Sequence, residues 1–256
     1  MTERRTGRQA LPKRVLALGA TSAIAEATLR LLAESGASFY LVARNPDKVA
    51  AVRDDLLTRG ASAATAIVLD LDDAADHPAM LGHAASTLGG IDLALLAHGV
   101  LGDQKRAEAD YSAAEAILRT NFLSAVSLIG WLTNYFEQER RGTLAVISSV
   151  AGDRGRKSNY VYGTSKGALN IFLDGVRHRL HGKNVQVLTI KPGFVATPMT
   201  AHLPPGPLFA QPARVARDIV RGLRKRKDVI YTPPFWRLIM LTVRNMPAWL
   251  FHKTNM

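Results

Sequence analysis

The sequence predicts one α/β domain in which helices cover both faces of a doubly wound parallel sheet, as a three-layer αβα sandwich. Short apolar runs alternate with segments of helical periodicity between residues 13 and 232, and no linker interrupts the alternation. The chain of 256 residues is long enough to bury a sizeable core, and 47% of its residues are hydrophobic. Outside this domain we expect a flexible basic N-terminus over 1–12 and an amphipathic C-terminal extension over 233–256.

The first predicted strand, 15–18, leads through a turn of small residues into a predicted helix over 27–34. A strand, a tight turn and a helix N-terminus can hold the pyrophosphate of a dinucleotide. Only position 19 of this turn is glycine, and alanine occupies positions 23 and 25, so an ordinary strand-to-helix turn is the alternative. The turn residues expected to contact the dinucleotide are Gly19, Thr21, Ser22, Ala23 and Ile24.

The second predicted strand, 38–42, is followed by Arg44 and then by an amphipathic helical pattern over 46–59. Dinucleotide folds that bind NAD(H) usually have an acidic residue near this strand end for the ribose 2′-hydroxyl. A guanidinium suits a 2′-phosphate instead, so we expect NADP(H) to be preferred, with NAD(H) as the second choice. The alternative is an exposed arginine that only caps the strand.

The third and fourth predicted strands, 66–69 and 91–97, are separated by a predicted helix over 77–88. The carboxylate of Asp70 follows the third strand and can accept a hydrogen bond from an adenine amino group. His98 follows the fourth strand, at the edge where open α/β sheets bind ligands, and we interpret it as lining the pocket rather than reacting. The contacts expected from these segments are Asp70, Leu71, Ala97, His98 and Gly99.

A serine, a tyrosine and a lysine follow the fifth predicted strand, 143–147, and lead into a predicted helix over 168–180. Tyr162 and Lys166 are four residues apart, so on a helix they share one face. An ammonium near a phenol lowers the phenol pKa toward working pH, and the Ser149 hydroxyl can hydrogen-bond a substrate oxygen. This set suits proton transfer to or from an alcohol, although tyrosine and lysine at this spacing also occur by chance.

Asn121 lies within a long helical pattern over 108–137, which we expect to form one helix or two. A polar amide inside an apolar helix needs hydrogen-bond partners if it is buried. Asn121 is therefore either structural or the holder of a water molecule.

The sixth predicted strand, 185–190, ends at a Pro-Gly pair that turns the chain sharply at the ligand-binding edge. The proline-rich segment 200–211 is expected to cover the site as a lid. Residues expected to contact the dinucleotide here are Pro192, Gly193, Val195 and Thr197.

The charge pattern predicts attraction to anions. The formal net charge is +12, and arginines recur every three or four residues over 214–224, as either an anion-attracting stripe or a solvated helix face. The extension 233–256 is both apolar and basic, and it is too short and too interrupted to span a bilayer. Trp236, Trp249 and Phe251 could face lipid as a peripheral membrane contact, while burial against a second subunit or the core is equally sensible.

Composition excludes several other classes. No cysteine is present, so neither a disulfide framework nor a thiolate metal site can form, and we expect no metal. The basic N-terminus lacks the apolar region of a secretory signal, and we expect a cytoplasmic protein, peripheral at most on the inner face of the membrane. No nucleic-acid motif accompanies the positive charge, so nucleic acid is not an expected partner.

Tyr162-x-x-x-Lys166, with Ser149, Asn121 and Pro192-Gly193 around it, resembles the classical short-chain dehydrogenase/reductase family over residues 14–231. The resemblance implies a Rossmann-like fold, a nicotinamide cofactor and homo-oligomers, as dimers or tetramers. It also implies that Tyr162 is the general acid/base and that Lys166 lowers its pKa and holds the nicotinamide ribose. Ser149 would polarise the carbonyl, and Asn121 would support a proton-relay water. Two family motifs depart from the pattern, at positions 18–25 and 96–99.

A narrower resemblance comes from 97–103, 199–203 and the C-terminus, which are similar to the branch of decaprenylphosphoryl-2-ketoribose reductases. It implies a lipid-linked keto-sugar as substrate. The alternatives to an enzyme are a non-catalytic dinucleotide-binding module and a membrane-associated scaffold of the same fold.

Overall fold

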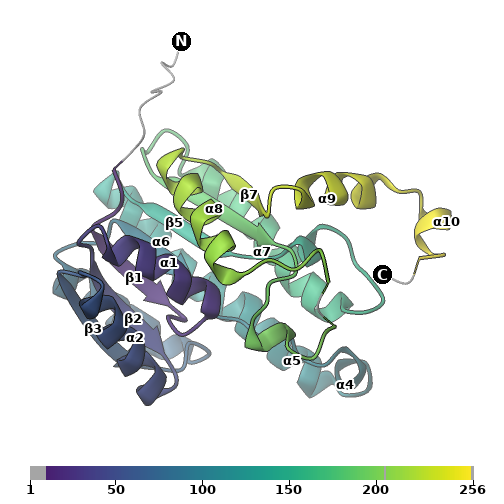
Figure 1. The fold of residues 1–256 in the computed structure, drawn as a ribbon, viewed down its shortest axis with the longest axis horizontal. Helices are drawn as coiled ribbons and strands as arrows, with labels where there is room; N and C mark the ends of the chain where they lie inside the picture. Colours follow the sequence, from purple (N-terminus) through teal and green to yellow (C-terminus); the bar gives the residue numbers. More distant parts are fainter. Residues whose placement is uncertain (1–9, 205, 255–256) are drawn as a thin grey trace, which may run out of the picture.

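The structure is a computed structural model that describes residues 10–204 and 206–254. Within this range the chain forms a seven-stranded parallel sheet in the order β3-β2-β1-β4-β5-β6-β7 (Figure 1). Most of the predicted N-terminal segment 1–12 lies outside the described residues. The strands are β1 (Arg14–Leu18), β2 (Ser38–Ala43), β3 (Ala63–Val68), β4 (Leu93–Leu96), β5 (Thr143–Ile147), β6 (Gln186–Pro192) and β7 (Val229–Thr232).

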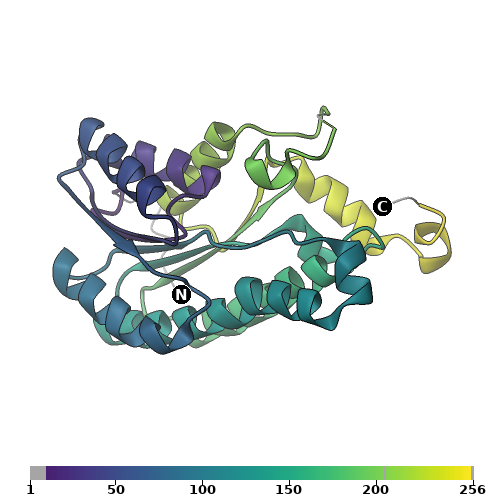
Figure 2. The same cartoon turned by 90° about the horizontal axis from the view of Figure 1, so that it is seen from below.

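Helices cover both faces of this sheet, so the predicted three-layer, Rossmann-like fold is confirmed (Figure 2). One apolar core lies between the sheet and α1, α2 and α8, and the other lies between the sheet and α3, α6 and α7. The helices are α1 (Ala23–Ala33), α2 (Pro46–Thr58), α3 (His77–Leu88), α4 (Gln104–Ala109), α5 (Tyr111–Leu118), α6 (Ser124–Glu139), α7 (Tyr160–Arg179), α8 (Pro212–Arg224), α9 (Trp236–Asn245) and α10 (Ala248–Phe251).

The expected long helix over 108–137 is divided, because Asp110 caps a new helix within it. The Asp110 carboxylate accepts a hydrogen bond of 2.9 Å from the Ser112 N–H, which ends α4 and begins α5. A π-helical turn, η2 (Arg119–Leu123), then joins α5 to α6. Such turns widen a helix locally and often occur at functional sites, and this one contains Asn121.

Two further elements differ from the sequence-based prediction. β7 was not predicted, because four residues at the end of a sheet, ranging from exposed Val229 to buried Thr232, are too few to show a clear alternation. α7 begins at Tyr160, earlier than the expected residue 168, so Tyr162 lies in its first turn. The apolar periodicity starts later than the helix, because the first turn of α7 faces the site rather than the core.

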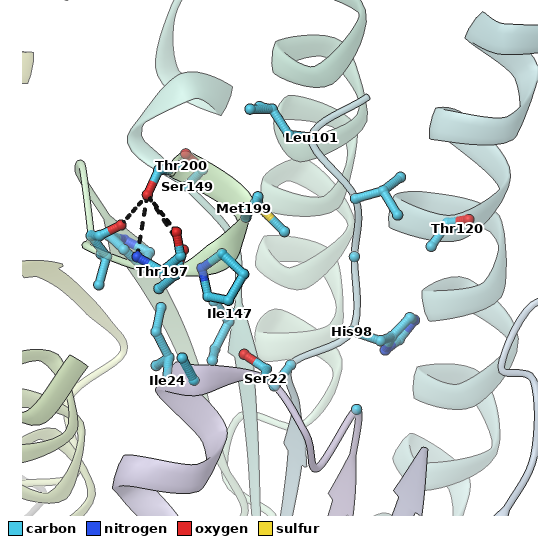
Figure 3. Close-up of a pocket in the computed structure, with 18 of the residues that line it drawn as sticks. Ser22, Ile24, His98, Leu101, Thr120, Ile147, Ser149, Thr197, Met199 and Thr200 are labelled. Atoms are coloured by element: carbon cyan, nitrogen blue, oxygen red, sulfur yellow. Dashed lines mark hydrogen bonds between the residues drawn. The ribbon is translucent and has the colours of Figure 1, made fainter. Parts of the chain in front are cut away.

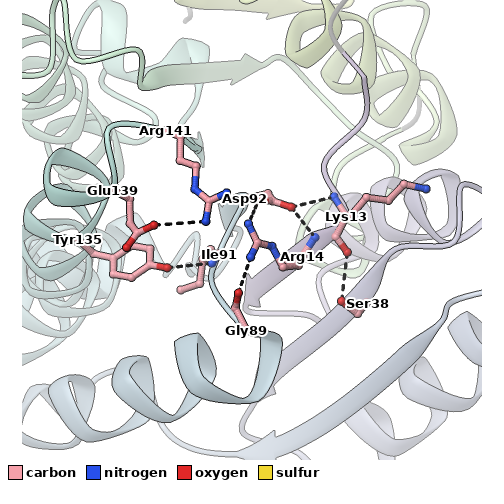
Figure 4. A network of polar contacts seen from close by, with 9 residues as sticks. All are labelled: Lys13, Arg14, Ser38, Gly89, Ile91, Asp92, Tyr135, Glu139 and Arg141. Atoms are coloured by element: carbon pink, nitrogen blue, oxygen red, sulfur yellow. Dashed lines mark hydrogen bonds and ion pairs between the residues drawn. The ribbon is translucent and has the colours of Figure 1, made fainter.

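A polar network closes the edge of the sheet opposite the ligand-binding edge (Figure 4). The Asp92 carboxylate accepts hydrogen bonds from the Lys13 and Arg14 N–H groups at 3.3 and 3.1 Å and pairs with the Arg14 guanidinium at 2.5 Å. The Tyr135 hydroxyl accepts from the Ile91 N–H at 3.0 Å, which ties α6 to the start of β4. These contacts fix the N-terminal ends of β1 and β4, whose carboxyl ends lead into the ligand-binding edge.

The C-terminal extension packs on the domain at its inner side only. Trp236 is 3% exposed and forms a small apolar cluster with Val150, Met240 and Val243. Of the alternatives left open for Trp236, the structure supports burial on the domain's own core, because its indole packs against Gly193 at the end of β6. Trp249 is 66% exposed, and α9 and α10 extend beyond the body of the domain (Figure 1).

Among the described residues, one helical stretch, Tyr111–Glu139, is long and apolar enough to span a membrane by length and composition. Half of its most apolar window is buried, and α6 contributes Leu128, Ile129, Leu132 and Phe136 to the core beside α7. We therefore interpret the stretch as core helix.

Candidate active site

A cleft of about 1280 Å³ opens at the carboxyl ends of the strands. It lies where the strand order reverses between β1 and β4, which is where doubly wound sheets bind ligands. Its volume exceeds the roughly 300–1,000 Å³ of ordinary small-molecule pockets, so a dinucleotide and a second ligand fit together. Figure 3 shows its walls: Ser22 and Ile24 from the start of α1, His98 after β4, and Thr197, Met199 and Thr200 after β6.

The turn between β1 and α1 keeps the backbone close to its neighbours. Gly19 has a φ of 83°, and a Cβ at this position would lie 2.5 Å from the His98 N. Its N–H and that of Ala20 donate to the Val42 carbonyl at 2.9 and 3.0 Å, which fixes the turn against β2. The small residues lining the cleft here fit a pyrophosphate at the N-terminus of α1, even with alanine at position 23.

The outer end of the cleft carries basic groups suited to a phosphate. Arg44 follows β2 and lines the cleft with Lys48, a second cation that the sequence analysis did not single out. The Arg44 guanidinium also pairs with the Asp70 carboxylate at 3.7 Å, and both side chains are more than half exposed. An exposed pair of this kind contributes little stability, so Arg44 can exchange Asp70 for a ligand phosphate at small cost.

His98 is a neutral, pocket-lining histidine. Its Nε2 lies 2.8 Å from the Ser124 Oγ, whose own proton is donated to the Thr120 carbonyl, so His98 Nε2 is the donor. Nδ1 is then an acceptor, and it is buried without a partner. Burial, with help from the positive charge of Lys166, lowers the pKa of His98 to about 3. An unpartnered acceptor in this wall fits a hydroxyl or amide donor of a dinucleotide.

The structure brings Ser149, Tyr162 and Lys166 together in the inner half of the cleft. Tyr162 and Lys166 project from the same face of α7, with Lys166 Nζ 5.9 Å from the centre of the tyrosine ring. Lys166 is 4% exposed, and its Nζ donates to the Ile147 carbonyl at 3.3 Å. Ser149 caps the short helix η3 (Val150–Asp153), accepting from the Ala151 N–H at 3.0 Å.

Neighbouring residues of the same types have other contacts. The Ser148 hydroxyl donates to the Asn170 side-chain oxygen at 2.7 Å, so it is held against α7 rather than presented to Tyr162. Tyr160 is 44% exposed and does not line the large cleft. These placements agree with the choice of Ser149 and Tyr162 as the chemical pair.

The expected lowering of the tyrosine pKa by lysine is not found in this unliganded site. Burial raises the pKa of Tyr162, while a hydrogen bond with Ser149 and the charge of Arg156 oppose that rise. Burial also lowers the pKa of Lys166 to about 8. The desolvation that encloses the site outweighs the ammonium, whose hydrogen bond points to the Ile147 carbonyl.

Asn121 is buried, and its side chain is fully engaged. Its Oδ1 accepts from the Val100 N–H at 2.8 Å, and its Nδ2 donates to the Val100 carbonyl at 2.8 Å and to the Ser165 Oγ at 3.1 Å. Both amide hydrogens are used, so Asn121 could support a relay water only through an oxygen acceptor, and its role toward such a water stays a prediction. Asn121 links the segment after β4 to α7 and so fixes the position of Lys166 relative to Gly99.

The inner wall of the cleft includes residues that sequence reasoning missed. Trp236 of α9 packs on Gly193 so closely that a Cβ there would lie 1.9 Å from the indole. The segment expected to act as a lid, 200–211, lines the cleft through Thr200, His202 and Leu203. Pro192, Val195 and Thr197, expected to contact the dinucleotide, line the cleft as well, with Pro198 and Met199 beside them. Asn159, just before α7, also lines it. Arg156 lines it too, and it belongs to the basic run 153–157, whose sequence already indicates contact with either an anionic substrate or solvent. In the sequence, the unusually apolar C-terminal segment around Trp236 is the one feature that indicates burial of this side chain.

Comparison with known proteins identifies the chain's relatives. The family model described as short chain dehydrogenase matches residues 13–207. An uncharacterised oxidoreductase of Mycobacterium tuberculosis is 38% identical over 239 residues, covering 93% of this chain and 96% of the relative. An uncharacterised oxidoreductase of Streptomyces coelicolor is 37% identical over 246 residues, covering 94% and 96%.

Among solved structures, a short-chain type dehydrogenase/reductase from Mycobacterium ulcerans superposes with a TM-score of 0.77. It is 20% identical and covers 87% of this chain and 89% of its own. At this identity the likeness concerns the fold, and it agrees with the strand order described above.

Proposed function

The chain belongs to the short chain dehydrogenase family, as an NAD(P)-dependent oxidoreductase, and we propose that it reduces a ketone or oxidises a secondary alcohol. The observation that carries this proposal is the convergence of Tyr162, Lys166 and Ser149 in the inner half of a cleft whose outer half fits a dinucleotide. When bound, the reduced nicotinamide supplies a hydride to the carbonyl carbon.

The side chains supply the proton and the orientation. The Tyr162 hydroxyl gives its proton to the carbonyl oxygen as that oxygen gains negative charge, and solvent later returns the proton. The Ser149 hydroxyl donates a hydrogen bond to the same oxygen. Because burial raises the pKa of Tyr162, the phenol is protonated at neutral pH and ready to act as the acid. Lys166 would hold the nicotinamide ribose and favour the phenolate. Asn121 fixes the position of Lys166 through its contacts with α7.

For the cofactor we propose NADP(H) in preference to NAD(H). Arg44 and Lys48 offer two positive charges at the outer end of the cleft, where a 2′-phosphate would lie, and Asp70 is the acidic group that accompanies them. Arg44 can bind this phosphate strongly, because its ion pair with Asp70 is exposed and contributes little stability.

For the substrate we propose a carbonyl compound of moderate size, with a lipid-linked keto-sugar as the specific candidate. The experiment is a screen that follows NADPH oxidation with polyprenyl-phosphate keto-sugars beside small ketones and steroids. The proposal predicts turnover with at least one ketone. Tight NADPH binding without turnover on any carbonyl would favour a non-catalytic dinucleotide-binding module instead.

We also propose a peripheral contact between the extension and anionic lipid. Leu238 and Leu241 of α9 are 69% and 61% exposed, and Trp249 and Leu250 of α10 continue the apolar surface. Arginine and lysine side chains accompany them, and the sequence 229–256 contains no acidic residue. Apolar side chains beside cations suit the boundary between headgroups and acyl chains.

A further inference from the structure

The segment between η3 and α7 carries three positive charges beside the candidate site, and their surroundings differ. The charged residues follow Ser149 after three small or apolar residues, in the order Asp153, Arg154, Arg156 and Lys157. The segment is held on both sides, so its side chains occupy defined positions. The Asp153 carboxylate pairs with Lys191 Nζ at 2.7 Å and accepts a hydrogen bond from the Tyr231 hydroxyl at 2.7 Å.

Arg154 has a structural role away from the cleft. Its guanidinium donates to the Met246 carbonyl at 2.6 Å and to the Val243 carbonyl, at the C-terminal end of α9. It also stacks 3.8 Å from the centre of the Phe251 ring. Arg154 therefore attaches the extension to the segment, and its charge is not available to a ligand.

Arg156 differs from Arg154 because it lines the cleft and has no protein partner there. Its Nε is buried without a hydrogen bond, and no ion pair or hydrogen bond to its side chain is found among the described residues. Asn159 Oδ1, three residues on and also in the cleft wall, is buried without a partner as well. Burial lowers the pKa of Arg156, and its electrostatic interaction with Tyr162 opposes that lowering.

A guanidinium nitrogen that is buried without a hydrogen bond, as Arg156 Nε is, is unfavourable in a protein that has no ligand for it. It becomes favourable when an anion arrives, because charge-assisted hydrogen bonds to arginine are strong and directional. Arg156 also lines a second, smaller cleft of about 360 Å³, with Gly155, Tyr160 and Phe251. The guanidinium thus lies where the large cleft and this smaller cleft meet, next to the tyrosine that would donate the proton.

We propose that Arg156 binds an anionic group, a phosphate or a carboxylate, on the carbonyl substrate. This inference rests on the proposed function for the location of the carbonyl at Tyr162. The anionic group lies at the junction of the two clefts, and the remainder of the substrate lies between there and Ser149. Asn159 Oδ1 accepts a hydrogen bond from a neighbouring substrate hydroxyl.

The experiment measures binding separately from turnover. The protein is loaded with NADP⁺, with which a ketone cannot react, and is titrated by calorimetry with two matched pairs: levulinate and methyl levulinate, and dihydroxyacetone phosphate and dihydroxyacetone. The wild type is compared with Arg156→Gln, with Arg156→Lys, and with Arg217→Gln. Arg217 is an exposed cation on α8, so its replacement removes the same charge away from the cleft.

The proposal predicts that in at least one pair the anion binds the wild type about tenfold more tightly than its neutral partner. The pair that shows the preference identifies carboxylate or phosphate as the group. Arg156→Gln should bring the ratio of anionic to neutral affinity close to one and leave the affinity for the neutral ligand unchanged. Arg156→Lys should keep part of the preference for the anion, and Arg217→Gln should keep all of that preference.

Equal binding within both pairs by the wild type would overturn the proposal. So would an equal loss of neutral and anionic ligands in Arg156→Gln, since that would show a structural role. Arg156→Gln could instead shift the pH profile of turnover of neutral ketones and leave the ratio of anionic to neutral ligand affinity unchanged. That result would show that Arg156 acts on the ionisation of Tyr162 and not on an anionic substrate group. Because the NADP⁺ complex cannot reduce a ketone, a failure of the proposed reaction would leave this binding result readable.

Discussion

At the scale of single residues, the chemistry of the cleft follows from which polar groups have partners and which do not. Asn121, Ser148 and Arg154 have protein partners for their side chains, so they hold the structure in place. His98 Nδ1 and Arg156 Nε are buried without partners in the same cleft. Unpartnered buried groups are rare in folded proteins, and here they lie where two ligands are proposed.

The neutral state of His98 predicts a pH dependence of stability. Its pKa is about 3 in the folded chain and about 6.5 in an unfolded one, so below pH 6.5 the unfolded state binds a proton that the folded state does not. Stability should therefore fall as pH decreases from 6.5, by at most about 1.4 kcal/mol per pH unit from this residue. Urea unfolding of the wild type and of His98→Asn at several pH values measures it, and equal slopes would contradict the assignment.

The role of Arg44 predicts a change in cofactor choice. Arg44→Asp replaces a cation by an anion where a 2′-phosphate would lie, so the affinity for NADPH should fall by at least about tenfold. The affinity for NADH should change by less, because it lacks that phosphate. Fluorescence titration with both cofactors gives the two constants, and Arg53→Asp on the exposed side of α2 is the matched control. An equal effect on both would mean that Arg44 is only a surface charge.

At the scale of secondary-structure elements, the short segments after the strands decide the site. The β1–α1 turn, the segment after β4, η3 and the turn after β6 all end at one cleft, because parallel strands present their carboxyl ends at the same edge. α7 supplies two of the chemical side chains from its first turns. α9 adds the inner wall through Trp236.

The contact between α9 and the turn after β6 predicts a strong coupling. Gly193→Ala places a methyl group against the Trp236 indole and should destabilise the protein by roughly 1–3 kcal/mol. In the double variant Gly193→Ala/Trp236→Ala this clash is gone, so the double should cost no more than Trp236→Ala alone. Chemical denaturation of the four proteins measures the cycle. Additive losses would show that Trp236 does not pack on Gly193.

Periodicity and turn chemistry predicted most of this arrangement. Buried strands such as 143–147 are continuous apolar runs, and glycine, proline and polar residues mark their ends, so both the sheet and its ligand-binding edge could be predicted. β7 could not, because it is short and only partly buried. Trp236 and Arg156 could not be placed either, since their positions depend on contacts between segments far apart in the chain, such as Arg154 with Met246.

At the scale of the whole molecule, a single domain separates three surfaces. The cleft occupies the carboxyl edge of the sheet, the Asp92 network closes the opposite edge, and the extension reaches beyond the body next to the cleft (Figure 1). The net charge of +12 favours association with anions in general, so cofactor, anionic substrate and anionic lipid would share one electrostatic preference.

The proposed lipid contact predicts that exposed leucines of α9 determine vesicle binding. The variant Leu238→Glu/Leu241→Glu should lose at least about tenfold in binding to vesicles with anionic lipid, because two apolar anchors become anions. Vesicle flotation at fixed ionic strength measures it. The control Leu57→Glu/Val68→Glu changes two exposed apolar residues on α2 and β3 and should bind as the wild type does. An equal loss of vesicle binding in both double variants would contradict a specific role of the extension in lipid binding.

In the function we propose, Tyr162 donates the proton in a nicotinamide-dependent reduction. Tyr162→Phe removes one hydroxyl and keeps the ring, so the cofactor cradle and the packing of α7 should persist. The direct measurement is NADPH oxidation with a ketone that the wild type reduces, together with the NADPH dissociation constant of both proteins. We expect the rate to fall by at least about 10²-fold while the dissociation constant changes less than about threefold. Full activity of Tyr162→Phe would contradict the claim.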